Sequence, residues 1–302
     1  MENAIESTRT AGRLMNPHEK LHAHHEKLIR TILQLADLTV ENPPDASLLL
    51  SYCGEYLLPH ADAEEITLYA ASNDKKFVQD LVLEHVELKH VLGLIHRGLT
   101  TRDVVMITTE AHNFTSLLKS HFDEEETCLM PALEKYLKPE QFQSLIETAH
   151  RLEAEKKRSD LTALFELDHK RIDMNISYVI DPVRSGGKIR EHYSSFRKQL
   201  LKHIELEETV LFPAFEESTK TGGAGPVQVM IQEHKVIVSL ISDPPDQMKE
   251  SEITATTKSL ISRLVVHNKK EEMILYPMIS GKLTGTERGE IFRVCFEGFR
   301  SV

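Results

Sequence analysis

Apolar residues recur at helical spacing along most of this 302-residue chain. Leu28, Ile32 and Leu35 fall on one helix face in the first half, and Leu161 and Leu164 begin a similar pattern in the second. No alternating strand pattern stands out between them. The hydrophobic pattern therefore predicts an all-α protein.

Turn-forming residues interrupt the helical pattern where four-helix bundles need loops. Proline, glycine, asparagine and aspartate cluster at 42–44, 72–74, 97–98, 181–187, 222–226 and 243–245. These breaks predict two tandem up-down four-helix bundles joined by a charged helical connector. The expected parts are an N-terminal tail (1–14), a first bundle (15–137), the connector (138–159), a second bundle (160–283) and a C-terminal segment (284–302).

One polar motif occurs four times: a histidine followed at +4 and +5 by two glutamates and at +8 by a leucine. The motifs begin at His60, His121, His203 and His267. Composition alone would give about 0.4 such His-Glu-Glu matches. On an α-helix the +4 spacing places the imidazole and the first carboxylate one turn apart on one face, where both can reach the same metal.

Another histidine precedes each motif by 33 to 36 residues. The repeating unit is thus a pair of helices, the first with a lone histidine and the second with His-x-x-x-Glu. If these faces point inward, each bundle collects four imidazoles and two carboxylates. The candidate ligands are His25, His60, Glu64, His85, His121 and Glu125 in the first bundle, and His169, His203, Glu207, His234, His267 and Glu271 in the second.

Such a buried set needs a counter-charge, and a cation is the natural one. Two carboxylates on facing helices can bridge two metals, leaving two imidazoles to each. Nitrogen and oxygen donors without thiolate suit iron or manganese, with zinc possible and copper disfavoured by the carboxylate bridges.

Several polar positions keep more than one interpretation. His22, His24 and His25 compete for the first-helix ligand, and alignment of the two halves selects His25; His22 and its counterpart Glu166 are candidate extra ligands or rim residues. The unmatched histidines are predicted to be surface residues: His18, His96, His112, His150 and His192.

The second glutamate of each motif points away from the first by about 100°. It either accepts the other ring N–H of a ligand histidine or is a plain surface charge. The same two interpretations apply to the acids before the third-helix histidines. The residues concerned are Glu65, Glu126, Glu208, Glu272, Glu84 and Glu233.

Prolines follow three of the motif histidines at +10, at Pro131, Pro213 and Pro277, whereas the first motif has Ala70. Because proline lacks an N–H, these helices are expected to bend or end there. Termination of the helix and a role in shaping the site remain equal alternatives.

Charge and composition exclude some classes of function. A net charge of −11 without a long basic block argues against nucleic-acid binding. No apolar run reaches the roughly 18 residues of a membrane span, and the N-terminus lacks signal-peptide features, so a cytoplasmic protein is expected. The three scattered cysteines suggest buried apolar side chains rather than disulfides, although Cys128 is predicted to lie near the ligand face.

With these residues in place, both halves resemble the hemerythrin-like, or HHE cation-binding, domain. The resemblance covers nearly the whole chain as two tandem copies. It implies four-helix bundles with a non-haem di-iron centre in each. Bridging carboxylates would be Glu64 with Glu125 and Glu207 with Glu271.

Two departures from the oxygen-carrying hemerythrins stand out. Those proteins add a histidine one turn after the third-helix histidine, where this chain has Lys89 and Val238, and they use His-x-x-x-x-Asp on the fourth helix. Six protein ligands instead of seven make the chain more similar to bacterial di-iron nitric-oxide-response and iron-centre-repair proteins. Fewer ligands leave more coordination positions open.

The resemblance and the open positions favour a protein that binds or reacts with dioxygen, nitric oxide or peroxide as a sensor, scavenger or stress-response protein. Iron handling or repair of damaged iron centres is a second hypothesis, and it requires a protein acceptor of iron. A third is catalysis, as a di-iron peroxidase, oxidase or nitric-oxide reductase.

Overall fold

The computed structural model describes residues 17–220 and 225–302. The expected N-terminal tail and most of the glycine-rich turn at 222–226 lie outside these ranges. Every regular element within them is helical, which confirms the predicted all-α class.

The helices of the first half include the first two of the four helix pairs that the sequence predicts. They are α1 (Pro17–Glu41), η1 (Pro43–Asp45), α2 (Ala46–Tyr52), η2 (Cys53–Leu57), α3 (Leu58–Ile66), α4 (Leu68–Ala71), α5 (Lys75–Thr101), α6 (Val104–Glu124), η3 (Glu125–Leu129), α7 (Met130–Tyr136) and α8 (Pro139–Lys156).

The second half repeats this order with small differences in its short segments. Its helices are α9 (Leu161–Ile180), α10 (Pro182–Ser185), α11 (Ile189–Leu206), η4 (Glu207–Leu211), α12 (Phe212–Thr219), α13 (Pro226–Leu240), η5 (Pro245–Gln247), α14 (Glu250–Lys270), η6 (Glu271–Leu275), α15 (Tyr276–Ser280) and α16 (Gly285–Arg300).

By contacts in space the chain divides into two compact units. The first contains described residues 17–34 with Tyr56–Lys89 and Phe114–Lys157, and the second contains Leu35–Glu55, His90–Asn113 and Arg158–Val302. This division does not follow the sequence repeat, so the domain limits inferred from the repeat stay a prediction.

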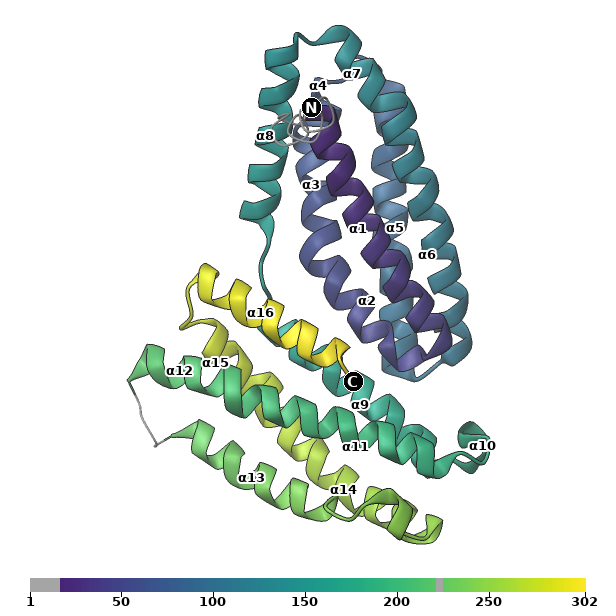
Figure 1. Cartoon of the computed structure of the whole chain (residues 1–302), viewed down its shortest axis with the longest axis vertical. Helices are drawn as coiled ribbons and strands as arrows, with labels where there is room; N and C mark the ends of the chain where they lie inside the picture. The colour runs from purple at the N-terminus through teal and green to yellow at the C-terminus, as the bar shows by residue number, and fades with distance from the viewer. Residues whose placement is uncertain (1–16, 221–224) are drawn as a thin grey trace, which may run out of the picture. The chain divides into compact units, whose positions relative to one another are not determined.

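In the first unit, parts of α1, α3, α5 and α6 lie side by side around the histidine-rich core (Figure 1). An apolar cluster closes one end of this core, where Leu21 of α1 meets Leu129 and Met130. The expected connector forms the helix α8, and its buried Phe142 and Ile146 pack on the same cluster. The connector is therefore part of the packed unit.

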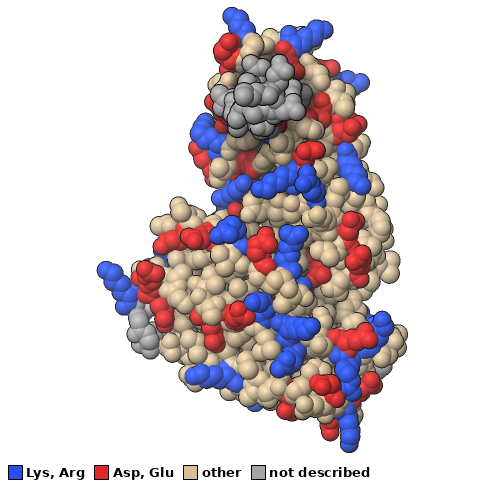
Figure 2. Space-filling model, in the orientation of Figure 1, with Lys and Arg blue, Asp and Glu red and all other residues tan. Residues whose placement is uncertain are grey.

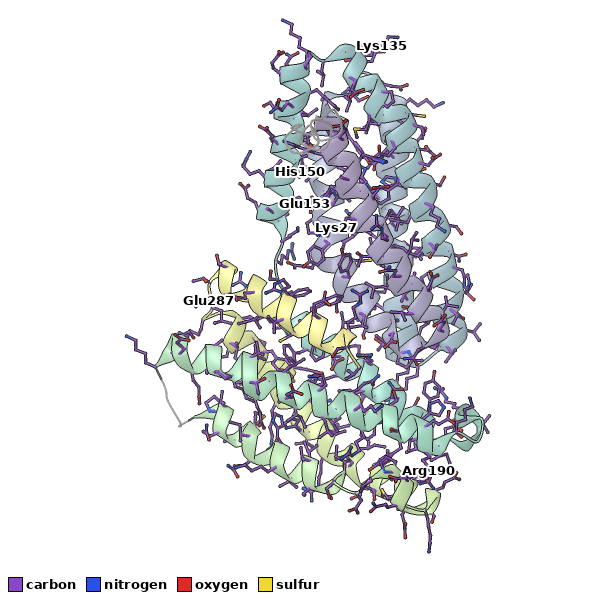
Figure 3. All side chains as sticks on the ribbon, in the orientation of Figure 1. Lys27, Lys135, His150, Glu153, Arg190 and Glu287 are labelled. Atoms are coloured by element: carbon purple, nitrogen blue, oxygen red, sulfur yellow. The ribbon has the colours of Figure 1, made fainter. Side chains whose placement is uncertain are left out.

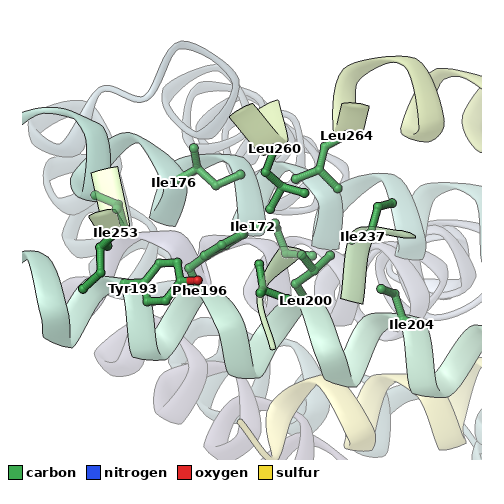
Figure 4. Packing of buried hydrophobic residues seen from close by; sticks show 12 residues of the cluster. Ile172, Ile176, Tyr193, Phe196, Leu200, Ile204, Ile237, Ile253, Leu260 and Leu264 are labelled. Carbon is green, nitrogen blue, oxygen red and sulfur yellow. The ribbon is translucent and has the colours of Figure 1, made fainter. Parts of the chain in front are cut away.

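In the second unit, α9, α11, α13 and α14 enclose an apolar cluster (Figure 4). Ile176 of α9, Phe196 of α11, Ile237 of α13 and Leu260 of α14 each expose no more than 3% of their surface. The start of α9 is fixed by Asp160, whose side chain accepts a hydrogen bond from a backbone N–H in the first turn.

Four segments of five residues form π-helical turns: η2, η3, η4 and η6. Each ends two residues before a proline. Proline has no N–H to donate, and the backbone N–H of the residue before it bonds to the carbonyl five residues back instead of four. In η3, η4 and η6 this acceptor is the carbonyl of the first motif glutamate. The prolines concerned are Pro59, Pro131, Pro213 and Pro277.

The motif helices therefore do not end at their prolines. α7, α12 and α15 follow the π turns directly. The first motif lacks this proline, and its helix breaks instead at Thr67, which has φ −113° and ψ −80°.

No helix in the described part of the chain is long and apolar enough to cross a membrane. On the face seen in Figure 2, acidic and basic side chains are interspersed.

Candidate metal centres

The six candidate ligands of the first half meet in the core of the first unit as two groups. One group contains His25, His60 and Glu64, and the other contains His85, His121, Glu125 and again Glu64; the potential ligand atoms of each group lie within 4.8 Å of one another. Oε1 of Glu64 lies 3.2 Å from Nε2 of both His25 and His60. This is the arrangement of two adjacent cation positions, each with two imidazoles, that share one carboxylate.

The second unit repeats this arrangement. His169 and His203 form one group and His234 and His267 the other, and Glu271 belongs to both. The remaining carboxylate, Glu207, lies across the core with Oε2 3.3 Å from Nε2 of His234 and 3.6 Å from Nε2 of His203.

All twelve residues are buried, with none exposing more than 5% of its surface. One oxygen of each of the four carboxylates is buried without a hydrogen bond among the described residues. Such unsatisfied oxygens cost free energy unless something positive binds them. The donors, two imidazoles and shared carboxylate oxygens at each position, fit a pair of iron-class cations.

The outer acids, which the sequence left as either hydrogen-bond acceptors or surface charges, accept hydrogen bonds from the ligand histidines. The ring nitrogen concerned is Nδ1, which faces away from the core. Nδ1 of seven histidines donates to a carboxylate at 2.7–3.0 Å. Such hydrogen bonds fix the tautomer, so that the Nε2 lone pair points to the centre. The pairs are His25–Glu126, His85–Glu65, His121–Glu84, His169–Glu272, His203–Asp168, His234–Glu208 and His267–Glu233.

His60 is the exception. Its counterpart His203 is bonded by Asp168, the residue before the first-helix histidine, but the equivalent position in the first half is His24. Glu153, from α8, takes over this role at 3.4 Å from Nδ1 of His60.

Two tyrosines at the centres were not predicted from the sequence. Tyr69 donates a hydrogen bond to Oε1 of Glu125 at 2.5 Å, and Tyr276 donates one to Oε1 of Glu207 at 2.6 Å. Both residues follow a motif histidine at +9. On a regular helix this spacing points about 180° away from the histidine.

The irregular turns explain why these tyrosines nevertheless face the cores. The extra residue in the π turn before Tyr276 rotates the following helix by about 100°, and the break at Thr67 redirects Tyr69. Burial, with the charge of Glu125, raises the pKa of Tyr69 far above its usual value. The phenol therefore keeps its proton and acts as a donor to the carboxylate.

The buried charges shift the pKa values of the candidate ligands. Burial lowers the pKa of His25, but hydrogen bonds to Glu126 and Glu64 outweigh it and raise the value to about 9. Carboxylate neighbours likewise overcome burial and raise the pKa of His60, His169 and His234 to about 10. Without a metal, protonated imidazoles thus balance the negative charge of these carboxylates. With a metal bound, the cation does so instead.

The model of one protein family matches most of the chain. It is described as the hemerythrin HHE cation-binding domain, and it matches residues 16–133 and 160–279. The chain belongs to the hemerythrin HHE cation-binding family. No curated protein and no solved structure matches it.

In this hemerythrin-like chain, the residue that replaces the second histidine of the third helix has different surroundings in the two repeats. Lys89 points to the surface and pairs with Asp62 at 3.0 Å, whereas Val238 is partly buried against the apolar cluster of the second unit. Neither side chain offers a ligand to the centre.

A small cavity of about 10 Å³ adjoins the first hemerythrin-like centre, with His60, Glu64, His85 and His121 among its lining residues. This is close to the space of one water molecule. In the second unit, His267 lies on the wall of a groove of about 610 Å³ whose other lining residues come from α13 and α14.

Other residues singled out from the sequence lie further from the centres. His22 is exposed and contacts Glu126 at 3.1 Å, and burial beside Glu272 raises the pKa of the half-buried Glu166. Cys53 and Cys295 are buried as predicted, but Cys128 is exposed. The prediction for Cys128 was wrong because the π turn at Glu125–Leu129 rotates it outward.

Among the unmatched histidines, His96 and His112 are exposed as predicted. His192 is half-buried and stacks on Tyr178. His150 departs most from the prediction, because its Nε2 is buried beside His24.

Proposed function

We propose that each repeat holds a non-haem di-iron centre that binds or reacts with dioxygen, nitric oxide or peroxide. The observation that carries the proposal is the sharing of Glu64 and of Glu271 between two pairs of imidazoles, with buried carboxylate oxygens left unsatisfied. Iron in such a site supplies electrons and open coordination positions to small ligands.

The protein's own residues prepare the sites for this chemistry. The outer carboxylates hold Nδ1 protonated on the histidines, so that Nε2 stays available for the metal. Tyr69 and Tyr276 each keep a proton at the phenol oxygen and hold one carboxylate in place. Apolar neighbours such as Phe122, at 4.9 Å from His25 between ring centres, limit access of water.

The unfilled third-helix position supports a reactive or sensing role over reversible carriage. The cavity at the first centre, at about 10 Å³, has close to the space of one water-sized ligand. Lys89 is among the residues that line this cavity, and its ammonium group pairs with Asp62 at 3.0 Å.

The experiment is anaerobic iron loading followed by exposure to dioxygen, nitric oxide or peroxide. We expect about two irons per repeat and a change in visible absorption with at least one of the three gases or oxidants. Less than about one iron per repeat, or no spectral response to any of them, would contradict the proposal. Steady turnover abolished by Glu64→Ala with Glu207→Ala would assign catalysis instead of stoichiometric binding.

A further inference from the structure

A second polar cluster lies next to the first di-metal centre, outside its six ligands. His24 comes from α1, and His150 and Glu153 come from α8, where they lie one turn apart (Figure 3). Glu153 exposes only 4% of its surface. Nothing in the proposed di-iron chemistry requires His24 or His150.

The distances within this cluster suit a cation. Oε2 of Glu153 lies 3.0 Å from Nε2 of His24 and 3.4 Å from Nδ1 of His60, and these three residues form a group whose potential ligand atoms lie within 4.8 Å of one another. His150 lies beside this group, with its ring centre 5.1 Å from that of His24. In a tetrahedral site with metal–ligand bonds of about 2.0–2.2 Å, neighbouring donor atoms are about 3.3–3.6 Å apart. The separation of 3.0 Å between His24 and Glu153 is close to this range.

Nε2 of His24 and Nε2 of His150 are buried and make no hydrogen bond among the described residues. The contact of His24 with Glu153 has the distance of an ion pair but not the angles of a hydrogen bond.

The charges also favour a cation here. Oε2 of Glu153 faces the imidazoles of His24 and His60. Lys157 contacts the other oxygen, Oε1, at 3.1 Å from a partly exposed position. Oε2 is therefore not taken up by the lysine.

We propose that His24, His150 and Glu153 form a third cation site, for one divalent metal of the zinc class, with water in the fourth position. Two imidazoles and one carboxylate with an open position are a donor set that zinc accepts. His60 keeps its Nδ1 proton and its hydrogen bond to Glu153, so this carboxylate connects the third site to the first di-metal centre.

The second repeat has no equivalent site in the part of the chain that the structure describes. Asp168 occupies the position of His24, and it bonds His203 directly. The third site is thus a property of the first repeat and of α8, and it does not follow from the repeated ligand motif.

The test loads the full chain with iron, dialyses it against Zn²⁺ and measures both metals. We expect one additional zinc per chain with the iron retained. His150→Ala should lose that zinc without losing iron, and His90→Ala, which removes an exposed histidine of α5, should retain both. Unchanged iron in His150→Ala shows that the variant is folded.

A second variant, Glu153→Gln, keeps the size of the side chain and should also lose the zinc. Equal zinc in wild type and in both variants would overturn the proposal, as would the absence of additional zinc in wild type. In metal-stripped protein, the expected difference between wild type and His150→Ala is still one zinc. The third site can thus be tested even if the iron centres prove to be wrong.

Discussion

Tyr276 donates a hydrogen bond of 2.6 Å to Glu207 across the core of the second repeat. In the first repeat Tyr69 does the same for Glu125. The two tyrosines occupy the same +9 position after a motif histidine, but on different helices of the pair: Tyr69 follows the first motif of its repeat and Tyr276 the second. Each centre therefore has one phenol, placed at either of two equivalent positions.

Replacing this phenol should weaken the metal site more than the fold. In Tyr276→Phe, Glu207 loses a donor, and we expect iron affinity at the second centre to fall by about 10- to 100-fold. The free energy of unfolding of the metal-free protein should fall by about 1–3 kcal/mol. Competition with a chelator measures the first quantity and urea denaturation the second. Tyr193→Phe is the matched control, because the buried hydroxyl of Tyr193 has no hydrogen-bond partner among the residues that the structure describes.

Because the +9 positions after the two motif histidines of a repeat are equivalent, a tyrosine at the other position should restore the lost iron affinity. Phe212, at +9 of the first motif in the second repeat, corresponds to Tyr69. Adding Phe212→Tyr to Tyr276→Phe should restore most of the lost iron affinity through a hydrogen bond to Glu271. If the single variant binds iron like wild type, or if the double variant regains nothing, the role given to the phenol is wrong.

The hydrogen bonds to Nδ1 should differ in importance between the repeats. Asp168 contacts His203 at 2.8 Å, whereas Glu153 lies 3.4 Å from His60. We expect Asp168→Asn to lower iron affinity in its repeat by about 10- to 100-fold, and Glu153→Gln to lower it less. Iron content after dialysis against a graded chelator measures both. A larger loss in Glu153→Gln would contradict this ranking.

The metal-free protein should lose stability in alkaline solution. His25, His60, His169 and His234 have folded-state pKa values raised from 6.5 to about 9 or 10. Their contribution is complete below about pH 6.5 and is lost as the pH rises through 9 to 10, by at least about 3 kcal/mol in total. Urea denaturation at several pH values checks this.

Iron loading provides the control for that pH dependence. Metal on Nε2 replaces the proton, so the decline between pH 6.5 and 10 should largely disappear in the loaded protein. An equally steep decline with and without iron would show that these imidazoles do not balance the carboxylates in the way we infer.

Much of the arrangement could be predicted because it depends on local spacing. The +4 relation of His203 to Glu207 holds on any regular helix, and the 33- to 36-residue separations fixed which helices had to face each other. The same repeat singled out the outer acids, such as Glu272, but left open whether they accept from a histidine; the structure pairs Glu272 with His169.

What the sequence did not reveal depends on irregular turns and on long-range packing. Tyr276 points to the core only because a π turn precedes it, and the same kind of turn exposes Cys128. Glu153 reaches His60 only because α8 packs on the first unit, a contact between residues 93 positions apart. Helical periodicity carries no information about either effect.

Iron stoichiometry in carboxylate variants tests the central claim most directly. The full chain, loaded anaerobically and freed of loose metal, should hold about four irons. Because Glu64 and Glu271 are each shared by both imidazole pairs of one centre, either Glu64→Ala or Glu271→Ala should reduce this to about two, and the double variant should retain almost none. A wild-type chain that holds less than about two irons, or a double variant that still holds four, would contradict the account.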